Sequence, residues 1–444
     1  MKLASRLLVI AAAGVIMCCS SLAVCAASPG RPAGAQLTNA VCGSEHWVGT
    51  WAASPSHAGN LLNGDLGPFV SVAEQTYRLI ITPHRGGDIV RLHLSNRFGS
   101  QPVTFAQVSI AHQDHGAVIS SDTLREVTFS GRPSVTAEPG TDVVSDPVRL
   151  SFQAFQNLAI SMYVPHLLTD PTQHASADAT SYYSHPGAGN HVRDTDATAL
   201  PNTTTNMPFL SSLDVQAPAG VTTLVALGDS LTDGAYIGAN GISDRAGNDR
   251  NIRYPDFLQH RLDQANRPLS VSNAGIGGNR LTADAPFYLP FAGPSVQHRI
   301  EHDVLNQPSV SDVIMLIGIN DLTLPPVTVT YKQMVDAYTT VINQLRSAGI
   351  KVHLATIMPG HGVRFGPVTI TGTPDPIRNP LNEWIRTQHL SDSVVDFDAA
   401  VRDPAQPNRL ATIYAGPDDL HLSPAGYARL SEAVDLDMLG VRCR

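Results

Sequence analysis

Two short stretches carry residues that together could transfer an acyl group. Gly228-Asp229-Ser230 follows an apolar run, and a serine at a strand-to-helix turn can offer a substrate its hydroxyl and its own backbone N–H. Near the C-terminus, Asp418 precedes His421 by three residues. A serine needs a base within hydrogen-bond reach, and a histidine base needs a carboxylate to fix its tautomer. We therefore predict Ser230 as nucleophile, His421 as base and Asp418 as the carboxylate that orients it.

Donors for the oxyanion of such a reaction lie in the same half of the chain. Asn320 follows an apolar run, at a position where a core strand needs no amide. The glycines within 273–279 allow a backbone to come close to a ligand. We predict an oxyanion hole made of the Ser230 N–H, the Gly278 N–H and the Asn320 side chain, because each donor stabilises the developing charge. Gly275 remains the alternative to Gly278, since the glycines cluster.

The elements around these stretches indicate an α/β fold from about residue 216 to residue 444. Compact apolar runs alternate with helix-like patterns, which predicts a parallel sheet covered on both faces. Functional sites in such sheets form at the carboxyl ends of the strands. Helices are expected to begin at Tyr254-Pro255 and Ser423-Pro424, and another to end at Gly349. The predicted strands are Thr223–Leu227, Ser270–Asn273, Val313–Ile317, Val352–Ile357 and Val394–Phe397.

The first half of the chain has a different period. Val90, Leu92 and Leu94 alternate with polar residues, as in half-buried strands, and similar alternation continues to Val164. We predict an all-β sandwich or jelly-roll-like domain within residues 28–215. The polar stretch Thr169–Asn206 is expected to be a long loop or linker.

The N-terminus is typical of an exported protein. Lys2 and Arg6 precede an apolar run that ends in small residues, which predicts a cleaved signal peptide over residues 1–27. We therefore expect a secreted or periplasmic protein without a stable membrane anchor. Removal of the signal peptide leaves two of the five cysteines, Cys42 and Cys443. We predict that these two form a disulfide in an oxidising compartment.

Charge composition argues against one class of partner. The formal net charge is −9, whereas binding to phosphates requires a basic face. No nucleic-acid partner is expected, and the predicted chemistry needs neither a cofactor nor a metal. The oligomeric state is left open.

Four sequence blocks, in the same order along the chain, resemble those of the SGNH hydrolases, also called the GDSL esterase/lipase family. The resemblance covers Gly228 to His421 and implies the nucleophile, oxyanion donors, orienter and base named above. Asp419 is a competing orienter, but it lacks the three-residue spacing to His421 that the family shows. The four blocks are Gly228-Asp229-Ser230, Gly277-Gly278-Asn279, Gly318-Ile319-Asn320-Asp321 and Asp418-Asp419-Leu420-His421.

This resemblance also carries expectations about fold and activity. It implies a three-layer, flavodoxin-like hydrolase domain. Two segments, 47–51 and 94–99, resemble the β domain that precedes it in exported, often bacterial, members. The implied activity is hydrolysis of carboxylic esters, either short acyl groups such as acetyl on carbohydrate or small esters. The alternative within this class is a lipase or lysophospholipase. We favour short acyl groups because no long apolar, lid-like segment precedes the site.

Two alternatives belong to other classes. The β domain could be a carbohydrate- or surface-binding module joined to an inactive hydrolase domain. Alternatively, His298, Glu301 and His302 fit the H-x-x-E-H signature of a zinc peptidase. The apolar spacing around them instead favours an amphipathic helix, whose polar positions would be solvated.

Overall fold

The computed structural model describes residues 42–58, 71–235, 247–287, 289–324, 329–361, 364–365, 368–369 and 373–440. The chain divides into two units, residues 1–31 and 32–444, of which the first lies outside the described residues. The predicted signal peptide and Cys443 also lie outside them, so export and the Cys42–Cys443 pairing stay predictions. Among the helices of the described segments, none is long and apolar enough to span a bilayer.

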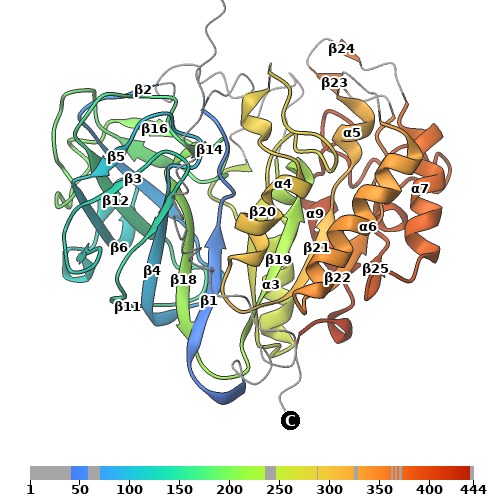
Figure 1. Cartoon of the computed structure of the whole chain (residues 1–444), viewed down its shortest axis with the longest axis horizontal. Coiled ribbons are helices and arrows are strands. Elements are labelled where there is room, and N and C mark those ends of the chain that lie inside the picture. The colour runs from blue at the N-terminus through green and yellow to red at the C-terminus, as the bar shows by residue number, and fades with distance from the viewer. Residues whose placement is uncertain are drawn as a thin grey trace, which may run out of the picture. The chain divides into compact units, whose positions relative to one another are not determined.

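The second half of the chain is built on a five-stranded parallel sheet (Figure 1). Its order, β20-β19-β21-β22-β25, places the second strand at one edge and the first strand beside it. This is the doubly wound order of flavodoxin-like folds, so the predicted fold class is confirmed. The first three strands are buried along their whole length, because helices cover them. The strands are β19 (Thr222–Gly228), β20 (Leu269–Gly275), β21 (Val310–Leu316), β22 (Lys351–Ala355) and β25 (Ser393–Val395).

The helices of this half form two groups. Contacts join α3, α8 and α9 in one group and α4, α6 and α7 in the other. In α6, six apolar side chains are buried, and Thr330 and Gln333 form a capping box at its start. The helices are α2 (Ser230–Asp233), α3 (Tyr254–Gln264), α4 (Val296–Ile300), α5 (Ile319–Thr323), α6 (Tyr331–Ser347), α7 (Asp375–Thr387), α8 (Phe397–Val401) and α9 (Pro424–Glu432), with shorter turns η3 (Pro290–Ala292), η4 (Glu301–Leu305) and η5 (Leu436–Met438).

The first half is a sandwich of two antiparallel sheets. One contains β1-β18-β4-β10 with β11 beside β4, and the other contains β16-β15-β3-β12-β6-β7 with β8 beside β6. Leu92 of β4 and Leu79 of β3 belong to a single buried core. In β4 the predicted alternation of buried and half-exposed residues is present, whereas β12 is buried on both faces, with Ser161 fully buried. The principal strands are β1 (His46–Ala52), β3 (Gln75–Ile81), β4 (Gly87–Ser95), β6 (Gln107–His115), β7 (Val118–Ile119), β8 (Arg125–Val127), β10 (Asp142–Val144), β11 (Val148–Phe152), β12 (Leu158–Val164), β15 (Ser181–Tyr183), β16 (Asn202–Thr204) and β18 (Leu210–Ala217).

The segment expected to be a loop or linker differs from that expectation. Within Thr169–Asn206, β15 pairs with β3 and β16 pairs with β15, so the segment extends the larger sheet. Ser181 and Asn206 are fully buried. Their polar side chains make hydrogen bonds inside the sandwich, for example from the Ile80 N–H to Ser181 Oγ at 3.0 Å. The polar composition of this segment therefore predicted a loop where the chain forms strands that are partly buried. The boundary at residues 215 and 216 stays a prediction.

The amphipathic helix expected around His298 is present, with one correction. It runs as α4 and then as a π-helical turn, η4, and its apolar residues Val296 and Ile300 are buried as expected. Two of its polar residues, Arg299 and Asp303, are buried rather than solvated. They form an ion pair of 2.9 Å, which is the physical reason that they can leave water.

Candidate active site

Ser230 stands at the turn between β19 and α2. Asp229 caps the helix, and its Oδ1 accepts a hydrogen bond from the Leu231 N–H at 3.0 Å. Gly228 closes the strand, and a Cβ there would lie 2.3 Å from the Leu316 carbonyl oxygen, so only glycine fits. The turn therefore fixes Ser230 at the carboxyl end of a central strand, with its side chain nearly buried.

The structure brings the three predicted catalytic side chains together. Oγ of Ser230 lies 2.8 Å from Nε2 of His421, across 191 residues of sequence. Nδ1 of His421 lies 2.6 Å from Oδ2 of Asp418. The other carboxylate oxygen of Asp418 accepts hydrogen bonds from the N–H groups of Leu420 and His421 at 3.1 and 2.9 Å. Asp418, and not the neighbouring Asp419, therefore orients the imidazole.

The charges of Asp418 and His421 shift each other's pKa and determine which nitrogen of His421 carries the proton. Burial would raise the pKa of Asp418, but His421 and the two backbone N–H groups lower it below its ordinary value. Burial alone would lower the pKa of His421, but the Asp418 carboxylate raises it above 6.5. A carboxylate only accepts hydrogen bonds, so in the neutral imidazole Nδ1 carries the proton and Nε2 accepts from the Ser230 hydroxyl.

The loop after β20 leaves one N–H group unused. The Gly275 N–H donates to Asn273 Oδ1, and the Gly277 N–H donates to Asp233 Oδ2 at 3.1 Å. The N–H groups of Ile276 and Asn279 donate to backbone carbonyls. Gly278 has no hydrogen-bond acceptor for its N–H in the part of the chain that the structure describes, and its φ is +78°.

Asn320 is tied to the same loop. It lies in the first turn of α5, and its Nδ2 donates a hydrogen bond to the Asn279 carbonyl at 2.9 Å. An amide nitrogen has two hydrogens, and among the described residues this one has no second acceptor, so its other hydrogen is available to a ligand. The next residue, Asp321, accepts hydrogen bonds from the N–H groups of Leu281 and Thr282 at 2.8 and 3.0 Å. The two loops that carry the predicted oxyanion donors are therefore joined.

Sequence reasoning missed the residues that support this loop. Arg299 donates to the carbonyls of Gly228 and Ala274, both at 2.8 Å, and to Oδ1 of Asn279 at 3.0 Å. Asp233 lies 3.1 Å from the buried His174 of the sandwich. Only the position of Asp233, three residues after Ser230, could have drawn attention to any of these side chains in the sequence.

The residues of the zinc-peptidase signature do not converge. His298 and His302 are exposed, and Nδ1 of His298 lies 2.7 Å from Oδ1 of Asp284. Glu301 is exposed as well. In the described ranges, no group of three or more His, Cys, Asp or Glu side chains is placed to hold a metal ion.

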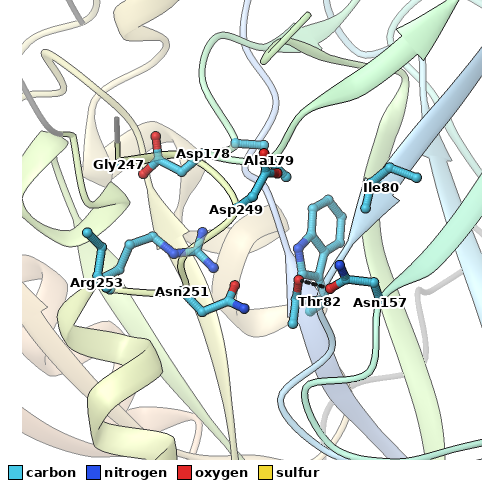
Figure 2. A pocket seen from close by; sticks show the side chains of 12 residues that line it. Ile80, Thr82, Asn157, Asp178, Ala179, Gly247, Asp249, Asn251 and Arg253 are labelled. Atoms are coloured by element: carbon cyan, nitrogen blue, oxygen red, sulfur yellow. Dashed lines mark hydrogen bonds between the residues drawn. The ribbon is translucent and has the colours of Figure 1, made fainter. Parts of the chain in front are cut away.

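A small pocket lined by both polar and apolar residues lies apart from these residues (Figure 2). Thr82 and Asn157 on one side of it are joined by a hydrogen bond of 2.8 Å, and Arg253 and Asn251 lie on the other side. None of the predicted site residues lines it. The convergence of side chains at Ser230, and not the presence of a deep pocket, marks the candidate active site.

Comparison with known proteins identifies a family for the half of the chain that carries these residues. Residues 226–429 match the GDSL-like Lipase/Acylhydrolase family, and no curated protein matches the chain. Solved structures similar to the chain include a family two carbohydrate esterase from Clostridium thermocellum in complex with cellohexaose, with 13% identity over 87% of this chain and 91% of that one and a TM-score of 0.36. A carbohydrate acetylesterase, Est24, from Sinorhizobium meliloti has 16% identity over 48% of this chain and 95% of that one, with a TM-score of 0.36.

Proposed function

We propose that this chain is an exported serine esterase and that residues 226–429, which match the GDSL-like Lipase/Acylhydrolase family, carry out the reaction. The observation that carries the proposal is the continuous hydrogen-bonded line from Ser230 through His421 to Asp418, with distances of 2.8 and 2.6 Å. Such a line is what a serine nucleophile requires.

The proposed reaction has two halves. His421 Nε2 takes the proton of Ser230 as Oγ attacks the ester carbonyl, and the N–H groups of Ser230 and Gly278 with the Asn320 amide bind the oxyanion. The tetrahedral intermediate collapses, the C–O bond breaks, and His421 returns the proton to the leaving alcohol. Water then attacks the acyl-enzyme with the same base, which releases the acid and restores Ser230. Asp418 stabilises the imidazolium in both halves.

We propose short acyl esters, such as acetyl groups on carbohydrate, or small esters as substrates. The support is the class that the family implies and the lack of a long apolar segment before the site in the sequence. A lipase or lysophospholipase is the alternative. A series of p-nitrophenyl esters from acetate to palmitate separates the two, because maximal kcat/KM on the longest chains would contradict the short-acyl proposal.

Replacement of the nucleophile tests the proposal itself. Ser230→Ala is expected to reduce turnover of the best ester by roughly 10⁴–10⁶-fold, with an unchanged circular dichroism spectrum. Ser272→Ala is the matched control, because Ser272 is a buried serine of β20 whose hydroxyl has no hydrogen-bond partner in the described part of the chain. Turnover that survives in Ser230→Ala would overturn the assignment.

Export is proposed on the N-terminal sequence alone. A mature protein that lacks residues 1–27 is expected in the periplasm or medium of an expressing bacterium. Its intact mass, measured without reduction, should be two hydrogens below that of the reduced chain if Cys42 and Cys443 are paired. Two free thiols would contradict the pairing and leave the esterase proposal untouched.

A further inference from the structure

Gly278 lies between two residues that are each held by a buried charged side chain. The Gly277 N–H donates to Oδ2 of Asp233 at 3.1 Å. On the other side, Oδ1 of Asn279 accepts a hydrogen bond from Nε of Arg299 at 3.0 Å. The orientation of the Gly278 N–H therefore depends on where these two charged groups lie.

Both charged groups are paired with the β-sandwich. The other carboxylate oxygen of Asp233 lies 3.1 Å from Nε2 of His174, in the short strand β14 (Gln173–His174). Strand β14 pairs with β17 (Met207–Pro208), and Met207 packs in the core of the sandwich. Arg299 pairs with Asp303 at 2.9 Å, and Asp303 in turn accepts a hydrogen bond at 3.1 Å from Arg97, which follows β4. Two series of ion pairs thus connect the sandwich to the two neighbours of Gly278: His174–Asp233 leads to Gly277, and Arg97–Asp303–Arg299 leads to Asn279.

These contacts are of the kind that fixes geometry. His174, Asp233, Arg299 and Asp303 are all buried, so each charge is stabilised mainly by its partner and holds that partner in place. Arg299 also bonds the carbonyls of Gly228 and Ala274, at the carboxyl ends of β19 and β20. A planar guanidinium that spans two strand ends and a loop amide joins them as one rigid unit.

We propose that the β-sandwich has a catalytic purpose: Arg97 and His174 are positioning residues that hold the loop around Gly278 in the conformation that binds the oxyanion. Neither side chain is assigned any contact with substrate. The proposal rests on the proposed esterase function. It gives the sandwich a role other than that of a separate binding module, and it gives the buried residues within the His298–His302 segment a role other than metal binding.

The test compares one substitution in each series of ion pairs. Arg97→Gln removes the charge that faces Asp303, and His174→Asn removes the ring nitrogen that faces Asp233. Each variant is expected to lower kcat about tenfold or more on p-nitrophenyl acetate with KM nearly unchanged, because small displacements of a reacting geometry cost up to ~10²-fold. Arg97→Lys, which restores the charge, is expected to recover part of the loss.

Binding of phenylboronic acid provides a second readout. Its adduct with Ser230 is tetrahedral and places an oxygen where the oxyanion forms, so its affinity should fall by the same factor as kcat. Arg91→Gln is the matched control. Arg91 also pairs with a buried aspartate, Asp214 at 2.7 Å, but both residues belong to strands of the sandwich, β4 and β18.

The possible outcomes separate the two proposals. If Ser230→Ala remains active, the esterase proposal fails. If Ser230→Ala is inactive but the folded Arg97→Gln and His174→Asn variants keep wild-type kcat and boronate affinity, the positioning proposal fails alone. An equal loss in Arg91→Gln would also overturn it, because the effect would then reflect general destabilisation. Should one variant not fold, the other still tests the same loop.

Discussion

Oδ2 of Asp418 lies 2.6 Å from Nδ1 of His421, while its Oδ1 accepts the backbone N–H of that same histidine. The carboxylate therefore holds both the ring and the backbone of His421. Two more features follow from this arrangement. The imidazole cannot rotate without losing a charge-assisted hydrogen bond, and Nε2 stays directed at Ser230 Oγ.

Replacement of this carboxylate should nearly abolish turnover. Asp418→Asn is expected to lower kcat on the order of 10⁴-fold, because an amide can donate to Nδ1 and so favour the wrong tautomer. Asp419→Asn is the control, since the carboxylate that faces Nδ1 of His421 is that of Asp418. Steady-state kinetics on a short p-nitrophenyl ester would measure both. Comparable losses of kcat in the two variants would mean that the conformation of the loop 418–421, and not the tautomer of His421, determines turnover.

The pH dependence of kcat/KM should report the environment of His421. Burial lowers its pKa, but Asp418 and, to a smaller extent, Asp229 raise it, so the net pKa lies above 6.5. Only the neutral imidazole can take the Ser230 proton, so activity should rise with pH through an inflection on the alkaline side of 6.5. In Asp229→Asn, which removes the negative charge that Asp229 gains as it ionises near pH 7, this inflection should move toward acid. An inflection at or below 6.5 in the wild type would contradict the electrostatic account.

Much of the second half could be predicted from the sequence, for a physical reason. Strands buried on both faces read as continuous apolar runs, and the residues that follow them meet at one edge of the sheet. Ser230 follows β19 and Asn320 follows β21, so local patterns could place both at that edge. His421 lies in the loop before α9, and its place beside Ser230, 191 residues away in the sequence, was implied by the resemblance to the SGNH hydrolases.

The supporting residues could not be predicted in this way. Arg299 and Asp303 occupy polar positions of an amphipathic helix, where periodicity places side chains in water. Their burial depends on partners far away in the sequence, such as the Gly228 carbonyl and Arg97. The same holds for Ser181 of β15, which is buried with its Oγ accepting a hydrogen bond from the Ile80 N–H of β3.

Asp229 should make the stability of the fold depend on pH. Burial raises its pKa from 3.8 to about 7, and its Oδ2 is buried without a hydrogen-bond partner in the described residues. Between these two values the folded state keeps the proton that the unfolded state loses, so this group's contribution to stability falls as pH rises from about 4 to about 7. Above pH 7 the full cost of the buried charge remains.

An uncharged replacement should remove that dependence. Asp229→Asn keeps an oxygen for the Leu231 N–H, so the helix cap is retained. Urea unfolding of both proteins at pH 4 and pH 8 is expected to show the variant gaining stability relative to the wild type at the higher pH. Titrating groups whose pKa does not depend on Asp229 cancel in this difference. A difference that does not change with pH would show that Asp229 ionises in the fold as readily as in the unfolded chain.

Gly278 and Gly277 allow a matched test of the oxyanion hole. At Gly278, φ is +78° and an added Cβ would lie 3.1 Å from the Cβ of Ala292, whereas at Gly277 the nearest atom would be 3.9 Å away. Gly278→Ala therefore costs roughly 1–2 kcal/mol in backbone strain, which the loop can relieve only by turning its N–H. We expect kcat of Gly278→Ala to fall by up to the ~10²–10³-fold that is typical when one oxyanion donor is lost. The kcat of Gly277→Ala should stay close to that of the wild type. If Gly278→Ala kept full kcat, the oxyanion would have to find its donors elsewhere, and Gly275 could serve only by releasing its N–H from Asn273.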